Sequence, residues 1–168
     1  MLISEAYREQ NRQLHESNPM YGASGVRWAD TIESLAEALK TRDVLDYGCG
    51  KQMLKKKLPY ITGYDPAIDG LDDEPSPATL VVCTDVLEHV EPGCLDAVLD
   101  DLHRVTGTTL FCTVGIGPAK KKLPDGRNAH LIQESHQWWL EKFFARFNIK
   151  TFQDLGAQFL VIADSNKA

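Results

Sequence analysis

Two glycines and two aspartates in this chain have the types and spacing of a nucleotide-binding turn. The run "VLDYGCG" places Asp46 two residues before Gly48, with Gly50 next, and Asp65 ends the following apolar run, "YITGYD". The glycines let the backbone turn tightly and approach a ligand without a Cβ in the way. An acid before the turn would repel a pyrophosphate but can receive an ammonium group, and an acid ending the second strand can bind a ribose diol. A ligand with both groups is S-adenosyl-L-methionine, which we expect to be the cofactor.

Other uses of the turn fit the sequence less well. A dinucleotide fingerprint needs a third glycine at position 53, where this chain has Met53, so NAD is disfavoured. No G-x-x-x-x-G-K-[ST] run occurs, which excludes a P-loop. The structural alternative is that the glycines only make a tight turn and that Asp65 only caps one. The spacings of Asp46 and Asp65 argue against that alternative.

A second group, Asp85, Glu88 and His89, has the spacing i, i+3 and i+4. One helical turn would bring all three side chains to the same side. The structural alternative is local: Asp85 caps a turn, Glu88 completes a capping box and His89 forms a nearby hydrogen bond. The residues alone leave both interpretations open.

The runs "VLDYGCG", "GYDPA" and "VVCTDVLEHVEP" resemble the successive cofactor motifs of class I S-adenosylmethionine-dependent methyltransferases, over roughly residues 40–165. The third glycine is often but not always present in that family, so Gln52 is a tolerated departure. The resemblance implies cofactor contacts from Asp85 and Val86, which follow the strand lying against the methionine part. Tyr21, in the loop "NPMYG", is expected to fold over the cofactor as a lid.

The Asp-x-x-Glu-His run is also similar to a Glu-x-x-Glu-His motif. Methyltransferases acting on the 3′-terminal 2′-hydroxyl of small RNAs carry it, as do the O-methyltransferases of ubiquinone biosynthesis. In the former, a later His completes a divalent-metal site, and "AHLIQESHQWW" provides His130 at the corresponding place. The resemblance implies a metal held by Asp85, Glu88, His89 and His130. The ligand types favour Mn, Fe, Co or Zn, although family precedent includes Mg. Without a metal, His130 or His89 is the expected catalytic general base.

Candidate substrate contacts follow the last parallel strand. Lys120, Lys121 and Arg127, in the loop before His130, are placed to meet a phosphate or carboxylate. Trp138 is a candidate for stacking on a base or sugar. The alternative for Trp138 and its neighbour Trp139 is one core contact and one surface contact.

Alternating strands and helices must position these residues. Apolar periodicity predicts helices at 2–16, 27–40, around Leu54 and Leu58, 91–106 and 135–147, and strands at 43–48, 60–65, 79–85, 108–116, 149–154 and 158–163. This order predicts an α/β fold, a Rossmann-like doubly wound sheet of the class I methyltransferase type that ends in an antiparallel hairpin.

The predicted fold is shortened in the middle. The family normally has a helix, a third strand and another helix between Asp65 and Thr79, where this chain has about a dozen residues of turn. The third strand usually supplies an acidic contact to the adenine, so adenine recognition has no assigned residue here. We predict one domain over 1–168, with N-terminal helices and a lid at 1–40 and the cofactor-binding core at 41–168.

Composition bounds the partners. The chain has 168 residues and a net charge of −6, which argues against a surface that grips duplex DNA. No apolar run approaches the roughly 20 residues of a membrane span, and the start lacks the features of a signal peptide. Its four cysteines form no CxxC pair, which is typical of reduced, buried thiols. We expect a cytoplasmic protein without a membrane partner, monomeric or homodimeric.

Three functions remain open. The leading expectation is methyl transfer to a hydroxyl of a small molecule, with assistance from a metal such as Mg or Mn. The first alternative is methylation of an RNA or nucleotide end, favoured by the metal motif and the lysines. The second is a non-catalytic S-adenosylmethionine-binding protein, for which the shortened middle is the argument.

Overall fold

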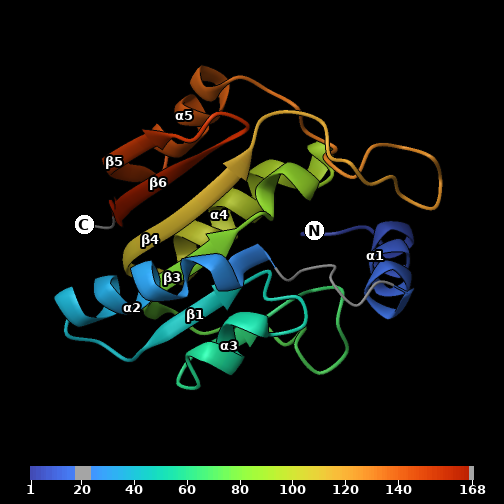
Figure 1. Cartoon of the computed structure of the whole chain (residues 1–168). Coiled ribbons are helices and arrows are strands. Elements are labelled where there is room, and N and C mark those ends of the chain that lie inside the picture. The colour runs from blue at the N-terminus through green and yellow to red at the C-terminus, as the bar shows by residue number, and fades with distance from the viewer. Residues whose placement is uncertain (18–23, 167–168) are drawn as a thin grey trace.

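A six-stranded mixed sheet forms the centre of the computed structural model, which describes residues 1–17 and 24–166 (Figure 1). The strand order is β2-β1-β3-β4-β6-β5, in which β2, β1, β3 and β4 are parallel and β6 is antiparallel to both β4 and β5. The strands are β1 (Val44–Tyr47), β2 (Thr62–Tyr64), β3 (Ala78–Thr84), β4 (Thr106–Gly115), β5 (Phe147–Asp154) and β6 (Gln158–Ser165).

Helices cover both faces of the sheet, as the alternation of elements predicts. α2 (Ala29–Ala38) and α3 (Met53–Lys57) pack on one face, and α4 (Leu95–Val105) and α5 (His136–Phe144) on the other. Strand β3 shows why: Leu80 and Val82 face α2, whereas Val81 and Cys83 face α4. Strands buried on both faces carry continuous apolar runs, which is what "TLVVC" shows.

The shortened middle is confirmed. No helix or strand occurs between the end of β2 at Tyr64 and the start of β3 at Ala78, both within the described part of the chain. The antiparallel hairpin is confirmed as well, with β5 at the sheet edge and β6 between β4 and β5. In the described ranges, no helix has the length and apolar character needed to cross a membrane.

Helix α1 (Glu5–Ser17) lies apart from the sheet, beyond the carboxyl ends of the parallel strands (Figure 1). It packs against the loop that follows β4, where Tyr7 forms a small apolar cluster with Leu123 and Ala129. Strand order reverses at β1, whose neighbours are β2 and β3. In such sheets the crevice at this switch point is the usual ligand site, and α1 covers it.

Candidate functional site

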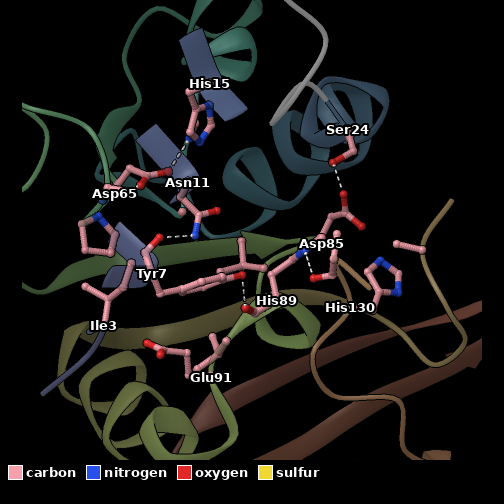
Figure 2. A pocket seen from close by; sticks show the side chains of 18 of the residues that line it. Ile3, Tyr7, Asn11, His15, Ser24, Asp65, Asp85, His89, Glu91 and His130 are labelled. Carbon is pink, nitrogen blue, oxygen red and sulfur yellow. Dashed lines mark hydrogen bonds between the residues drawn. The ribbon is translucent and has the colours of Figure 1, made fainter. Parts of the chain in front are cut away.

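One cavity of about 580 Å³ lies at the switch point, between the strand ends and α1. Figure 2 shows side chains from α1, the segment after β2, and the loops after β3 and β4 arranged around it. Nine of the residues predicted from the sequence line this cavity: Gly48, Gly50, Asp65, Asp85, Val86, His89, Lys120, Lys121 and His130.

The glycine turn after β1 has the conformation that its glycines predict. Gly48 and Gly50 have positive φ angles of 79° and 49°. The amides of Gly48 and Cys49 both donate to the Tyr64 carbonyl, at 2.8 and 3.0 Å, which joins the turn to β2. A Cβ on Gly48 would lie 2.4 Å from Cγ2 of Val86. Glycine is therefore required at position 48 by backbone conformation and by close approach.

Asp65 fixes the turn from the second strand. Its carboxylate accepts hydrogen bonds from the amides of Gly50, at 3.0 Å, and Ala67, at 2.9 Å. The side chain is buried, yet it lines the cavity. Because each carboxylate oxygen has two lone pairs, Asp65 retains capacity to accept further hydrogen bonds from a ligand.

Asp46 lies in a small recess beside the main cavity. The recess, of about 30 Å³, shares Gly48 and Asp85 with the large cavity. Within 1–17 and 24–166, no donor pairs with the Asp46 carboxylate. Burial, and to a lesser extent the charge of Asp65, raise the pKa of Asp46 from 3.8 to about 7. A buried carboxylate of this kind is stabilised by an arriving cation.

The raised pKa of Asp46 predicts a stability cost that grows with pH. The folded state holds this proton more tightly than the unfolded chain, so stability falls as pH rises from about 4 through 7. Asp46→Asn should therefore raise the free energy of unfolding at pH 8 by roughly 2 to 4 kcal/mol and leave it nearly unchanged at pH 4. Urea denaturation at both pH values measures this. Asp73→Asn, at an exposed position, is the matched control. If Asp46→Asn raised the free energy of unfolding equally at pH 4 and pH 8, the raised pKa of Asp46 would be contradicted.

Asp85, His89 and His130 form a cluster at the other end of the cavity. One potential ligand atom from each lies within 4.8 Å of those from the other two. The imidazole rings of His89 and His130 meet edge to face, with centroids 4.8 Å apart. Nδ1 of His89 lies 2.7 Å from the Ala129 carbonyl, and Nδ1 of His130 lies 2.6 Å from that of Gly117. These carbonyls select the Nδ1–H tautomer, which leaves Nε2 of each ring as the atom with a lone pair.

Asp85 has a strained backbone and an ionised side chain. Its φ is 60°, in the left-handed region that non-glycine residues seldom adopt. Burial raises the pKa of Asp85, but the Ser24 hydroxyl, which donates to Oδ2 at 2.7 Å, and the nearby His89 more than offset this, so the pKa is lowered. Asp85 is therefore the anionic member of the cluster.

Glu88 departs from the four-residue metal set that the resemblance implies. It is fully buried, its Oε1 accepts a hydrogen bond from the Gly115 amide at 2.5 Å, and it is not among the clustered ligand atoms. Burial, followed by the Asp85 charge, raises the pKa of Glu88 well above its ordinary value. The capping-box alternative is wrong, because the 3₁₀ helix Leu87–His89 has no side-chain cap. Glu88 ties the loop after β3 to the end of β4.

Two predicted substrate contacts, Arg127 and Trp138, do not line the cavity. Arg127 forms an ion pair with Asp125 at 2.7 Å, and Trp138, on α5, packs against the core with the Lys142 ammonium over its ring. For the tryptophan pair, the structural alternative holds: Trp139 is fully buried and Trp138 is half-buried. Tyr21 lies outside the described residues.

The sequence interpretation missed the residues that α1 contributes. Ile3, Tyr7, Asn11 and His15 all line the cavity, and they recur every fourth position. The sequence held one signal of this role, because the polar residues Asn11 and His15 share a helix face with Tyr7. A helix face that packs only against a core carries apolar residues, so polar residues there indicate contact with something else.

Comparisons with known proteins agree with this geometry. The family model described as "Methyltransferase domain" matches residues 22–159. No curated protein matches the chain. Three similar solved structures are all methyltransferases or methyltransferase domains, and at 13% to 17% identity they establish the fold alone.

The first is a Burkholderia thailandensis 1,6-didemethyltoxoflavin N1-methyltransferase with its substrate and S-adenosylhomocysteine bound. It has a TM-score of 0.71 and 13% identity over 96% of this chain and 88% of that chain. The second, magnesium protoporphyrin IX methyltransferase from Synechocystis PCC 6803 with S-adenosylhomocysteine, has a TM-score of 0.59 and 14% identity over 96% and 95%. The third, the methyltransferase domain of bacterial CtHen1-CN, has a TM-score of 0.56 and 17% identity over 84% and 99%.

The family match covers most of the chain, and the glycine turn, Asp65 and the strand order agree with it. The chain belongs to the class I S-adenosylmethionine-dependent methyltransferases.

Proposed function

We propose that this methyltransferase acts on a hydroxyl of a small molecule, with assistance from a divalent cation at Asp85, His89 and His130. The observation that carries the proposal is that one continuous cavity of about 580 Å³ connects the glycine turn and Asp65 to this cluster. That volume lies within the range of small-molecule sites. Because α1 and the loop after β4 both wall it, the acceptor is expected to be small.

The residues at the glycine turn fit S-adenosylmethionine. Gly48 lines the cavity without a Cβ, at a position where a Cβ would overlap Val86, and Asp46 is a buried carboxylate without a partner among the described residues. Asp46 would receive the ammonium group and Asp65 the ribose hydroxyls. When bound, this cofactor supplies an electrophilic methyl group on a sulfonium. The chain's part is then to hold the acceptor oxygen in line and remove its proton.

The cluster fits a divalent cation. Backbone carbonyls accept from the Nδ1–H groups of both imidazoles, which is the second-shell arrangement usual for histidine ligands that bind through Nε2. Asp85 adds one negative charge. Two imidazoles and one carboxylate suit Mn, Fe, Co or Zn, and Mg is the harder alternative. A bound cation supplies Lewis acidity, which lowers the pKa of an acceptor hydroxyl.

In the absence of a cation, His89 or His130 would take the proton at Nε2. Burial, opposed by the Asp85 charge, lowers the pKa of His89, so this ring is neutral near pH 7 and able to accept one. Methylation of an RNA or nucleotide end is the second candidate. It is favoured by Lys120 and Lys121, which line the cavity beside His130.

A transfer assay with methyl-labelled cofactor tests the proposal. Phenols, catechols, amines and a 3′-terminal ribonucleotide are offered as acceptors, each with Mn²⁺, Mg²⁺ or EDTA. We expect label on a small hydroxyl compound and stimulation by one of the cations of at least tenfold over EDTA. Label only on amines would reject the hydroxyl, and equal rates in EDTA would reject the cation. S-adenosylhomocysteine binding without labelling of any acceptor would favour the non-catalytic alternative.

A further inference from the structure

One face of α1 runs along the whole cavity. Tyr7, Asn11 and His15 are four residues apart, so they share a face of the helix, and Ile3 continues the stripe before the helix begins. Figure 2 shows this series passing from the neighbourhood of His89 and Glu91 to that of Asp65. The polar members, Asn11 and His15, lie toward the Asp65 end.

Contacts on both sides of the cavity fix the position of α1. Near the loop after β3, the Tyr7 hydroxyl donates to the His89 carbonyl at 2.6 Å, and Ser4 donates to the Glu91 carboxylate from its amide at 2.8 Å and its hydroxyl at 2.7 Å. On the other side, Arg8 forms ion pairs with Asp72 at 2.6 Å and Asp69 at 3.3 Å. The helix therefore bridges the two segments that follow β3 and β2.

This bridging helix occupies the side of the cavity where the fold is shortened. Residues 65–77 contain neither the third strand nor its flanking helices. Two acids of this segment, Asp69 and Asp72, are paired with Arg8 of α1. Beyond Asp65 the cavity is lined by Pro66 and Ala67 from this segment and by α1. A purine attached to a ribose at Asp65 would thus meet α1.

We infer that α1 supplies the adenine subsite of the cofactor, with the Asn11 amide pairing with the edge of the base and His15 beside the ribose. An asparagine amide presents one acceptor and one donor together, which matches the N6 amine of adenine and an adjacent ring nitrogen. Asn11 is buried, and its Nδ2 donates to the Tyr7 carbonyl at 3.0 Å, which fixes the plane of the amide. This inference rests on the family's cofactor and is independent of the acceptor.

His15 supports the same placement. Burial lowers the pKa of His15, although the nearby Asp65 carboxylate opposes the shift, so the ring is neutral near pH 7. A neutral imidazole has one N–H donor and one acceptor nitrogen, so His15, beside Asp65, can also contact a sugar hydroxyl or the base.

Titration calorimetry with two ligands tests the assignment. The ligands are S-adenosylhomocysteine and S-inosylhomocysteine, in which a carbonyl replaces the N6 amine. We expect the wild-type chain to prefer the adenine compound by about tenfold or more. Asn11→Ala should weaken adenine binding by about tenfold and abolish the preference. Gln13→Ala is the matched control, because Gln13 is an exposed residue of the same helix whose side-chain amide bonds Glu9, and it should change neither quantity.

A second variant separates recognition from damage to the helix. Asn11→Ser keeps a small polar group that can still bond the Tyr7 carbonyl, yet it cannot make two contacts with a base. It should therefore lose the preference while melting within a few degrees of wild type. An undiminished preference for adenine in both variants would overturn the inference, and so would wild-type binding without any preference. Loss of preference in a protein that methylates no hydroxyl would still support the inference while contradicting the proposed function.

Discussion

Replacing His130 by alanine is expected to lower the turnover number by about 10² to 10⁴ while S-adenosylhomocysteine affinity changes by less than about twofold. His130 lines the cavity in the cluster with Asp85 and His89, and the Gly117 carbonyl holds its Nδ1–H, so Nε2 is the atom expected to react. The loss follows whether Nε2 holds a cation or accepts the proton directly. Single-turnover methyl transfer and calorimetry on the same preparation measure the two quantities.

His136→Ala is the control for this prediction. That residue is also a half-buried histidine, but it begins α5, packs against Phe152 of β5 and Phe159 of β6, and does not line the cavity. Its removal should leave turnover within about twofold. A His130→Ala enzyme that keeps a third or more of wild-type turnover would remove this residue from the chemistry.

Metal binding distinguishes the two roles of His130 and tests the size of the ligand set. If the cluster holds a cation, Asp85→Asn and His130→Ala should each weaken Mn²⁺ binding, measured by electron paramagnetic resonance, by at least tenfold. Glu88→Gln should not, because Oε1 of Glu88 bonds the Gly115 amide and the amide isostere can keep that bond. Equal losses in Glu88→Gln and Asp85→Asn would restore the four-ligand set.

The sequence predicted the fold closely because its signals are local. Apolar strands ending in "DYG" and "GYD", and a proline opening the helix after β3, each depend on a few neighbouring residues. The absent third strand was equally visible, since no apolar run of sufficient length stands between Asp65 and Thr79. The glycine turn and Asp65 follow directly from these elements, because the carboxyl ends of parallel strands meet at one edge of the sheet.

The site was less predictable where side-chain direction depends on tertiary contacts. The i, i+3, i+4 spacing places Asp85, Glu88 and His89 on one face of a helix only if the backbone is α-helical from residue 85 onward. Instead Asp85 adopts φ of 60° and a short 3₁₀ turn follows, which directs Glu88 to the Gly115 amide in the core. The contribution of α1 is similar, because its contacts with His89 and Glu91 span more than 80 residues of sequence.

Gly48→Ala should weaken S-adenosylhomocysteine binding by roughly 100-fold, the largest effect expected of any cofactor-site substitution. The left-handed φ of 79° costs an alanine about 1 to 2 kcal/mol, and its Cβ would lie 2.4 Å from Cγ2 of Val86. Relief of that clash requires Val86 to move, and Val86 lines the cavity. The backbone strain and the clash with Val86 are each expected to weaken binding by about tenfold.

The two terms can be separated by a second substitution. Val86→Ala in the Gly48→Ala background removes the γ carbons at 2.4 and 2.9 Å, and it should recover about tenfold in affinity while the backbone term persists. Gly93→Ala is the control, since a Cβ there meets no atom within 4 Å and its φ is not left-handed; it should bind as wild type. If Gly48→Ala bound S-adenosylhomocysteine normally at an unchanged melting temperature, the cofactor would not approach this turn, and the roles given to Asp46 and Asp65 would fall with it.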